Sequence, residues 1–296
     1  EQLLWKLDAR QLSALRSGLA GSLAASGSIS GTMDTPRTTF VADARGLGLA
    51  QKARKANTSL LHASGEAWLA AATGKGAARD IHLRTTGTAR GFDPAVFGSP
   101  VAGSINGKFD ADGRLGKDIS GNLGVTLDQS TLSNAPLWGH ARLSGSTRLI
   151  TAADVDLHIG PNVIAAKGRF GAPADRLDWR IDAPQLAVLG GDFGGVLRGS
   201  GTLSRTAQAP ALTASLEGQN VKVMGKHQVR SLRASANIGA RQGGATPMVS
   251  NVEIAGFSSG ETRIDSARLQ TTGTRAAHTL NLSARGEAFD ATVQAR

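Results

Sequence analysis

The residues best suited to chemistry are three side chains that alternate along one short segment, Asp154, Asp156 and His158. In an extended strand every second side chain points to the same face, so these groups would offer three ligands to a metal ion from one face. A metal site also needs supporting groups, and no second segment supplies His or carboxylates at ligand spacing. We therefore interpret these residues as the solvated face of a strand and predict no metal site.

Nucleophilic catalysis has as little support. The chain has no cysteine, which excludes a thiolate nucleophile, a sulfur-ligated metal and a disulfide framework. The serines in Gly145-Ser146-Thr147 and Gly199-Ser200-Gly201 lack the strand-to-helix setting of a nucleophile elbow. The glycine-rich segment 190–195 lacks the βαβ context of a dinucleotide site. We predict that the protein is not an enzyme and uses no cofactor.

The charge balance points to an anionic partner or to a solvated surface. The chain carries 33 Lys and Arg against 23 Asp and Glu, a formal net charge of +10, and such an excess favours phosphate groups. The basic residues stand singly and do not cluster on one helix, as a groove-reading DNA-binding protein would require. Aromatic residues make up only 4% and Tyr is absent, so the stacking platforms of single-strand binders are missing. We predict no nucleic-acid partner.

Alternation of apolar and polar residues is the dominant pattern, as in the segment 153–159, and it predicts half-buried strands. Turn signals such as Asn106-Gly107, Asp112-Gly113 and Gly160-Pro161-Asn162 separate these runs at short intervals. Glycine accounts for 38 of the 296 residues, a share nearly twice the roughly 7% of an average protein. The sequence thus predicts an all-β chain, with helical turns only near 11–15 and 94–97.

The apolar members of the alternating runs are the candidate binding residues. A sheet with one apolar face must either pack on a second layer, as in a sandwich core, or leave that face for a ligand. The sequence offers no helix to cover it, and a one-residue slip in register would move a whole strand to the other face. The candidates are Leu123, Val125, Leu127, Val155, Leu157, Ile159, Leu177, Trp179, Ile181, Leu280 and Leu282.

The chain also contains a long internal repeat. A shift of 174 positions aligns 7–36 with 181–210 without a gap, and twelve of these thirty pairs are identical. Average residue frequencies would give roughly two or three identities. A weaker third copy begins near Phe92. We expect residues 1–296 to form a single repeat-built segment, with modules starting near 7, 92 and 181 that bury their apolar faces only on neighbours.

The segments 7–15 and 18–32, closed by Pro36, resemble the repeat signature of the TamB-type proteins of Gram-negative bacteria. The glycine-bounded strand pair 160–171 and the strand entry 273–280 are also similar to elements of that family. The resemblance covers nearly the whole chain. It implies an elongated β-taco, which is an open, β-solenoid-like twisted sheet with a continuous apolar concave groove, of the kind found in AsmA-like, bridge-like lipid transfer proteins.

The function that the resemblance implies is transport of phospholipids from the inner to the outer membrane, with acyl chains held in the groove. It also implies a periplasmic location, a parent protein anchored in the inner membrane, and an Omp85-type, TamA-like outer-membrane barrel as partner through regions absent here. No window reaches the roughly 18 apolar residues of a membrane span, and the chain starts in mid-pattern, so we expect a segment of a longer protein.

Two other functions remain open at this stage. One is an assembly or translocation module for outer-membrane barrels and autotransporters, which would pair its sheet edges with incoming strands. The other is a structural rod or adhesin repeat. A lipid conduit needs the apolar faces of all strands in register on one side, an assembly module needs an open edge, and a rod needs a closed core.

Overall fold

A computed structural model describes residues 2–50, 58–70, 79–116, 118–147, 149–205, 210–239, 246–287 and 289–296. In these residues the secondary structure consists of eighteen β-strands and three 3-10 helices, without an α-helix. The chain divides into two compact units, Glu1–Arg148 and Leu149–Arg296, called unit 1 and unit 2 below. The prediction of an all-β, open twisted sheet is confirmed.

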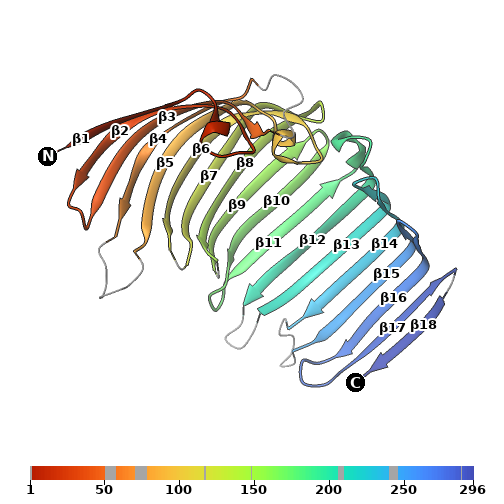
Figure 1. The fold of residues 1–296 in the computed structure, drawn as a ribbon. Helices are drawn as coiled ribbons and strands as arrows, with labels where there is room; N and C mark the ends of the chain where they lie inside the picture. The colour runs from red at the N-terminus through yellow and green to blue at the C-terminus, as the bar shows by residue number, and fades with distance from the viewer. Residues whose placement is uncertain are drawn as a thin grey trace. The chain divides into compact units, whose positions relative to one another are not determined.

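Unit 1 is an antiparallel meander in which each strand pairs with the next one along the chain (Figure 1). Its strands are β1 (Leu3–Ala9), β2 (Leu19–Gly31), β3 (Pro36–Leu49), β4 (Leu60–Leu69), β5 (Ile81–Phe92), β6 (Gly103–Leu115), β7 (Ser120–Leu132) and β8 (Ala135–Ser146).

Unit 2 repeats this arrangement with ten strands, and each of them pairs with the next one along the chain. Its strands are β9 (Ile150–Ile159), β10 (Asn162–Phe170), β11 (Arg176–Ala183), β12 (Gly194–Arg205), β13 (Pro210–Val223), β14 (His227–Ile238), β15 (Met248–Ser259), β16 (Thr262–Gly273), β17 (His278–Gly286) and β18 (Phe289–Ala295).

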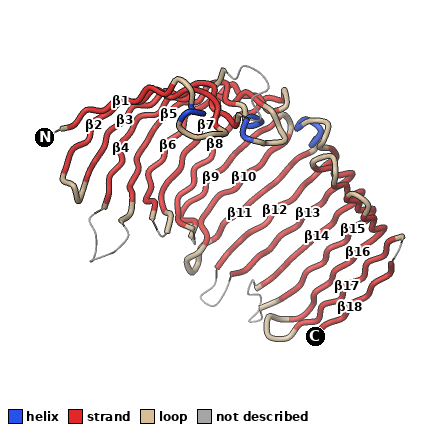
Figure 2. Tube along the Cα trace, in the orientation of Figure 1, coloured by secondary structure: helices blue, strands red, loops and turns tan. Residues whose placement is uncertain are grey.

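Three 3-10 helices interrupt the meander, each in a connection between two strands (Figure 2). They are η1 (Leu12–Ala14) between β1 and β2, η2 (Pro94–Phe97) between β5 and β6, and η3 (Leu186–Leu189) between β11 and β12. The two helical turns predicted from the sequence are thus confirmed, and near each of the three expected module starts a strand is followed by a 3-10 turn and then by another strand. Positions 206–209, near the end of the aligned repeat, lie outside the described residues.

Polar contacts fix two of these turns to the sheet. Asp93 caps η2, because its Oδ1 accepts hydrogen bonds from the amides of Ala95 and Gly103, both at 3.0 Å. The side-chain amide of Asn162 holds the start of η3 with two hydrogen bonds to the backbone of Gln185, at 2.9 and 3.0 Å. The turns therefore sit at defined places at the strand ends.

In the described residues each unit is a sheet without a covering layer. The surface area of the chain is 18352 Å², whereas two separate compact domains of half its mass would expose about 14,000 Å² in total. Among the described residues ten apolar side chains count as buried, and six of these are alanines. A core of this kind forms within one layer, where backbone and small side chains shield one another. The closed core of a sandwich, the alternative interpretation, is absent from this part of the chain.

Bulges cross unit 1 near one end of its strands. The register shifts in β2, β5 and β7, where Gly21, Gly91 and Gln129 have φ values of 105°, 61° and 44°. A bulge bends its strand and increases the local twist. Glycine suits this left-handed backbone because it has no Cβ. The bulges therefore bend the sheet of unit 1 close to η1 and η2.

A tryptophan lies over a glycine of the neighbouring strand at the same place in both long repeat copies. A Cβ at Gly201 would stand 2.8 Å from the Trp179 ring, and one at Gly27 would stand 2.8 Å from the Trp5 ring. Both pairs are direct register partners and are related by the shift of 174. The repeat therefore preserves a packing unit in which the ring replaces the missing side chain.

Substituting Gly201 with Ala should destabilise unit 2, because the new Cβ would also stand 2.5 Å from the carbonyl oxygen of Thr213. Overpacking of this kind costs about 1–3 kcal/mol, which lowers the melting temperature by several degrees, at about 2–4 °C per kcal/mol. Gly191→Ala is the matched control, since a Cβ there meets no atom within 4 Å. Thermal unfolding followed by circular dichroism compares them, and equal melting temperatures would contradict this packing.

Candidate functional site

The register of unit 1 gathers its apolar side chains on one side of the sheet. Direct partners in an antiparallel pair point to the same face. Leu123 pairs with Ala111 and Leu143, and Val125 pairs with Phe109. Followed through all eight strands, this apolar face includes Trp5, Leu7, Leu23, Ala25, Gly27, Phe40, Ala42, Ala44, Leu61, Ala63, Gly65, Leu83, Thr85, Gly87, Phe109, Ala111, Leu123, Val125, Leu127, Ala141 and Leu143.

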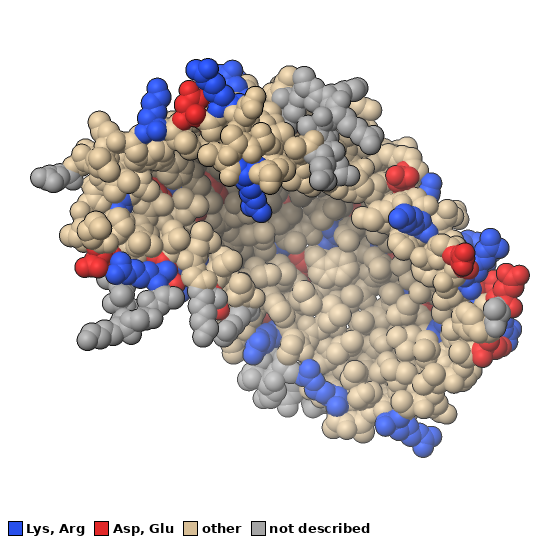
Figure 3. Space-filling view, in the orientation of Figure 1, with Lys and Arg blue, Asp and Glu red and all other residues tan. Residues whose placement is uncertain are grey.

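Unit 2 has an apolar face of the same kind. Leu157 pairs with Ile164, which pairs with Ile181. Followed through ten strands, the face includes Val155, Leu157, Ile164, Ala166, Trp179, Ile181, Gly199, Gly201, Ala214, Leu216, Ala234, Ala236, Ser250, Val252, Leu269, Thr271, Leu280, Leu282, Val293 and Ala295. In Figure 3 the middle of β12–β17 shows no Lys, Arg, Asp or Glu on this side.

All eleven candidate residues lie on these two faces. Three belong to the apolar face of unit 1, namely Leu123, Val125 and Leu127. Eight belong to that of unit 2, namely Val155, Leu157, Ile159, Leu177, Trp179, Ile181, Leu280 and Leu282. Their placement follows from the register, whereas their role in holding lipid stays a prediction.

The sequence interpretation missed most of unit 1, including Trp5, Phe40, Leu83 and Phe109. On these strands glycine and alanine occupy many positions of the apolar face, as in the row Ala25, Ala42, Ala63 and Gly87, so hydrophobic alternation is weak. The available signal was the internal repeat, because Trp5 and Gly27 correspond to Trp179 and Gly201.

The apolar faces are accessible. Leu123 and its partner Leu143 are 46% and 42% exposed, and Val293 in β18 is 49% exposed. Large contiguous apolar patches are uncommon on soluble monomers and mark interaction sites. These side chains can therefore be contacted from solvent without any rearrangement of the sheet.

The opposite face of each unit carries the charges. In unit 2 the register places Asp182, Arg198, Glu217, Arg233, Glu253 and Arg268 side by side on β11–β16, with alternating sign. Ion pairs link Arg198 to Asp182 at 3.1 Å and Arg268 to Glu253 at 2.8 Å. In unit 1 a similar row links Arg84 to Asp112 at 2.9 Å. These rows favour the observed register, because a slip of one residue would carry them onto the apolar side.

Arginines on the charged face of unit 2 also lower the pKa of two carboxyl groups. Hydrogen bonds from Arg198 and Arg180 lower the pKa of Asp182 below its ordinary value. Hydrogen bonds from Arg176 and Thr202 lower the pKa of Asp178 in the same way. The carboxylate of Asp178 is exposed and that of Asp182 is partly exposed, so their effect on stability is screened by water.

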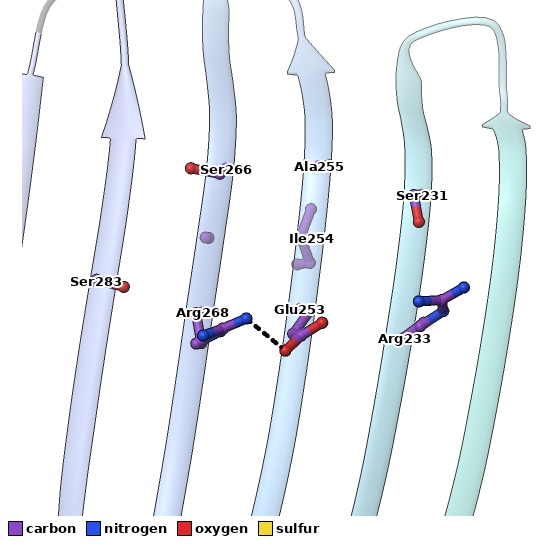
Figure 4. A pocket seen from close by; sticks show the side chains of 9 residues that line it. Ser231, Arg233, Glu253, Ile254, Ala255, Ser266, Arg268 and Ser283 are labelled. Atoms are coloured by element: carbon purple, nitrogen blue, oxygen red, sulfur yellow. Dashed lines mark ion pairs between the residues drawn. The ribbon is translucent and has the colours of Figure 1, made fainter.

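The charged face of unit 2 contains a shallow hollow of about 370 Å³, drawn in Figure 4. Arg233, Glu253 and Arg268 line it, together with serine hydroxyls on neighbouring strands. Figure 4 shows Glu253 paired with Arg268, which neutralises one of the two arginines. The hollow is part of the row of alternating charges on β11–β16 and lies on the side opposite the apolar face.

The candidate metal-binding residues lie on the charged side of β9, where His158 Nε2 is 3.1 Å from Asp156 Oδ1. Within the residues that the structure describes, no group of three or more His, Cys, Asp or Glu side chains is arranged to hold a metal ion. The same part of the chain contains no helix long and apolar enough to cross a membrane.

Comparison with known families matches residues 77–296 to the model described as TamB, N-terminal domain. The match covers most of the chain and includes β5–β18. No curated protein and no solved structure matches the chain.

Replacing Arg198 with Ala should raise the pKa of Asp182 toward its ordinary value of about 3.9, because the hydrogen bond that lowers this pKa most is lost. Since the folded pKa lies below the unfolded one, the ion pair stabilises the fold above pH of about 4, and this contribution disappears as pH falls through the lowered pKa. Carboxyl NMR titration measures the shift. Arg233→Ala, which changes an arginine two strands from Arg198, is the control. An unchanged Asp182 titration in Arg198→Ala would contradict the assignment.

Proposed function

Because the chain belongs to the TamB family of envelope proteins, we propose that it carries phospholipids between the inner and outer membranes by holding their acyl chains on its apolar faces. The family match supports a role in lipid or protein transport in the envelope. The observation that favours lipid is the register, which keeps uncharged side chains along the middle of one side through eight strands in unit 1 and ten in unit 2.

Hydrocarbon suits such a surface because it needs no hydrogen bonds. The backbone groups of the sheet already pair between strands, and the side chains of the apolar faces offer few polar atoms. Each buried CH₂ contributes about 0.8 kcal/mol, so a dozen methylenes contribute on the order of 10 kcal/mol before ordering costs. This is enough to keep an acyl chain out of water.

Movement along the faces requires that no position binds much more tightly than the next. Consecutive strands present similar combinations of Leu, Val, Ile, Ala and Gly, as in the row Leu216, Ala234, Val252, Leu269 and Leu282. Similar neighbours give similar binding free energies, so a lipid moves by small steps. In this proposal the protein supplies binding and passage and no covalent chemistry.

The proposed setting is the periplasm, with the parent protein anchored in the inner membrane and an Omp85-type barrel as its outer-membrane partner. Members of the family work with an outer-membrane partner, which supports this arrangement in general terms.

An assembly module for outer-membrane proteins is the second candidate. It is supported by the family match as well, because that match is consistent with transport of lipid or of protein in the envelope. Exposed strand edges accept further strands by β-augmentation. The structural rod is not favoured, because the described residues of the two units form no closed core.

Photocrosslinking in cells tests the lipid proposal directly. A photoreactive residue at Leu157 or Trp179, on the apolar face of unit 2, should capture lipid, whereas one at the polar neighbours Asp156 or Arg180 should not. Mass spectrometry of the adducts identifies the cargo. Equal labelling of both sets, or no lipid at any position, would contradict the proposal, and capture of barrel proteins would favour the assembly module.

A carboxylate on the apolar face should block passage. Leu269→Glu places a charge between Val252 and Leu282, and covering that charge with hydrocarbon is costly because nothing pairs with it. We expect capture of an acyl probe on β17 to fall at least about ten-fold, a loss that corresponds to 1.4 kcal/mol. Gln270→Glu is the matched control, since the neighbouring residue lies on the charged face. Equal capture in the two variants would argue against a continuous path.

A further inference from the structure

The two margins of the apolar face of unit 2, where strands end and connections begin, differ in charge. One margin consists of the connections β10–β11, β12–β13, β14–β15 and β16–β17. It also includes the last two residues of the strand before each connection and the first two residues of the strand after it. We call it the arginine margin, because its described residues include Arg169, Arg176, Arg205 and Arg275 but only one acid, Asp175. Figure 3 shows Lys and Arg without visible Asp or Glu along the lower edge of this face.

The opposite margin is balanced. Defined in the same way, it comprises the connections β9–β10, β11–β12, β13–β14, β15–β16 and β17–β18. Its described charges are Lys222, Lys226, Arg263 and Arg285 against Asp182, Asp192, Glu261, Glu287 and Asp290. Figure 3 shows both signs along the right-hand edge. The excess of positive charge is therefore a property of one margin only.

Two arginines of the arginine margin have acidic partners and two do not. Arg169 lies 3.6 Å from Asp175, and Arg176 lies 2.8 Å from Asp178. Within the described residues, Arg205 and Arg275 make no ion pair and no side-chain hydrogen bond. Their guanidinium groups are thus available to an external anion, and the planar guanidinium can bind phosphate with two parallel hydrogen bonds.

Arg205 is placed to combine such a contact with the apolar face. It ends β12, and it alternates with Leu203 and Gly201. Its side chain therefore leaves the sheet on the apolar side. Residues 205 and 201 are about 13 Å apart along the strand, and the acyl chains of one leaflet extend about 15 Å. A lipid whose phosphate meets Arg205 would therefore reach Gly201 and the ring of Trp179 that covers it.

We propose that the arginine margin binds the phosphate of an anionic phospholipid, so that the cargo lies along the strands with its headgroup at Arg205 and its acyl chain over the apolar face. Arg275, four strands away and about 19 Å along the margin, is a second headgroup position. The proposal rests on the lipid-carrying function above and adds to it the orientation of the cargo and a preference for negatively charged headgroups.

Three probes that share one acyl chain, with a diazirine at its end, test this. They are lysophosphatidylglycerol, which is anionic, lysophosphatidylcholine, which is zwitterionic, and an uncharged monoacylglycerol. The 296-residue chain should capture the anionic probe best at low salt, with adducts around Trp179. Arg205→Glu with Arg275→Glu should lower that capture about ten-fold, the effect of losing a hydrogen-bonded charge contact, and should leave capture of the monoacylglycerol unchanged.

Lys226→Glu with Arg263→Glu is the matched control, because it changes the net charge equally at the opposite margin, and it should leave capture of the anionic probe unchanged. Circular dichroism verifies that both double variants are folded. Equal loss in the two variants, or capture of the three probes at similar levels with no dependence on Arg205, would overturn the headgroup assignment while leaving acyl binding intact. Absence of capture for all three probes would overturn the proposed function as well.

Discussion

The antiparallel register is the constraint on which the rest of the molecule depends. Every strand interior must satisfy its backbone groups by pairing with its neighbours, and in a single layer this pairing also decides which side chains share a face. Through unit 2 the row that contains Leu157, Ile181 and Leu216 stays on one side, while the row that contains Asp182, Arg198 and Glu217 stays on the other. A shift of one residue at any pair would exchange the two.

Two kinds of interaction hold that register. On the charged side, opposite charges face each other between strands, as in Arg198 with Asp182 and Arg268 with Glu253. On the apolar side, rings complement glycines of the next strand, as Trp179 does at Gly201. The exposed ion pairs contribute little individually, but a slip of one residue would carry a whole row of charges onto the apolar face. The selection against wrong registers is therefore stronger than the stabilisation by any one pair.

How much of this could be predicted from the sequence depended on side-chain size. Where Leu, Val, Ile and Trp alternate with charged residues, as at Leu157 and Trp179, the face was predictable from periodicity alone. Where glycine and alanine fill the positions of the apolar face, as at Ala42 and Gly87, periodicity does not predict the face, because a small side chain carries little hydrophobic signal. The strand pairing, the bulges at Gly21, Gly91 and Gln129, and the free arginines of one margin are tertiary properties, and no local pattern contains them.

A surface that carries lipid must bind hydrocarbon well at every point and prefer no point strongly. In the proposed function the apolar faces meet the first condition by area and the second by repetition, since consecutive strands offer similar side chains. Charge cannot serve on such a surface, because a buried charge without a partner is costly. It can serve at the margin, where Arg205 lies at the end of an apolar row yet remains in water. In the proposed arrangement, separating the two tasks, hydrocarbon on the face and phosphate at the edge, allows orientation of the cargo without a deep pocket that would stop it.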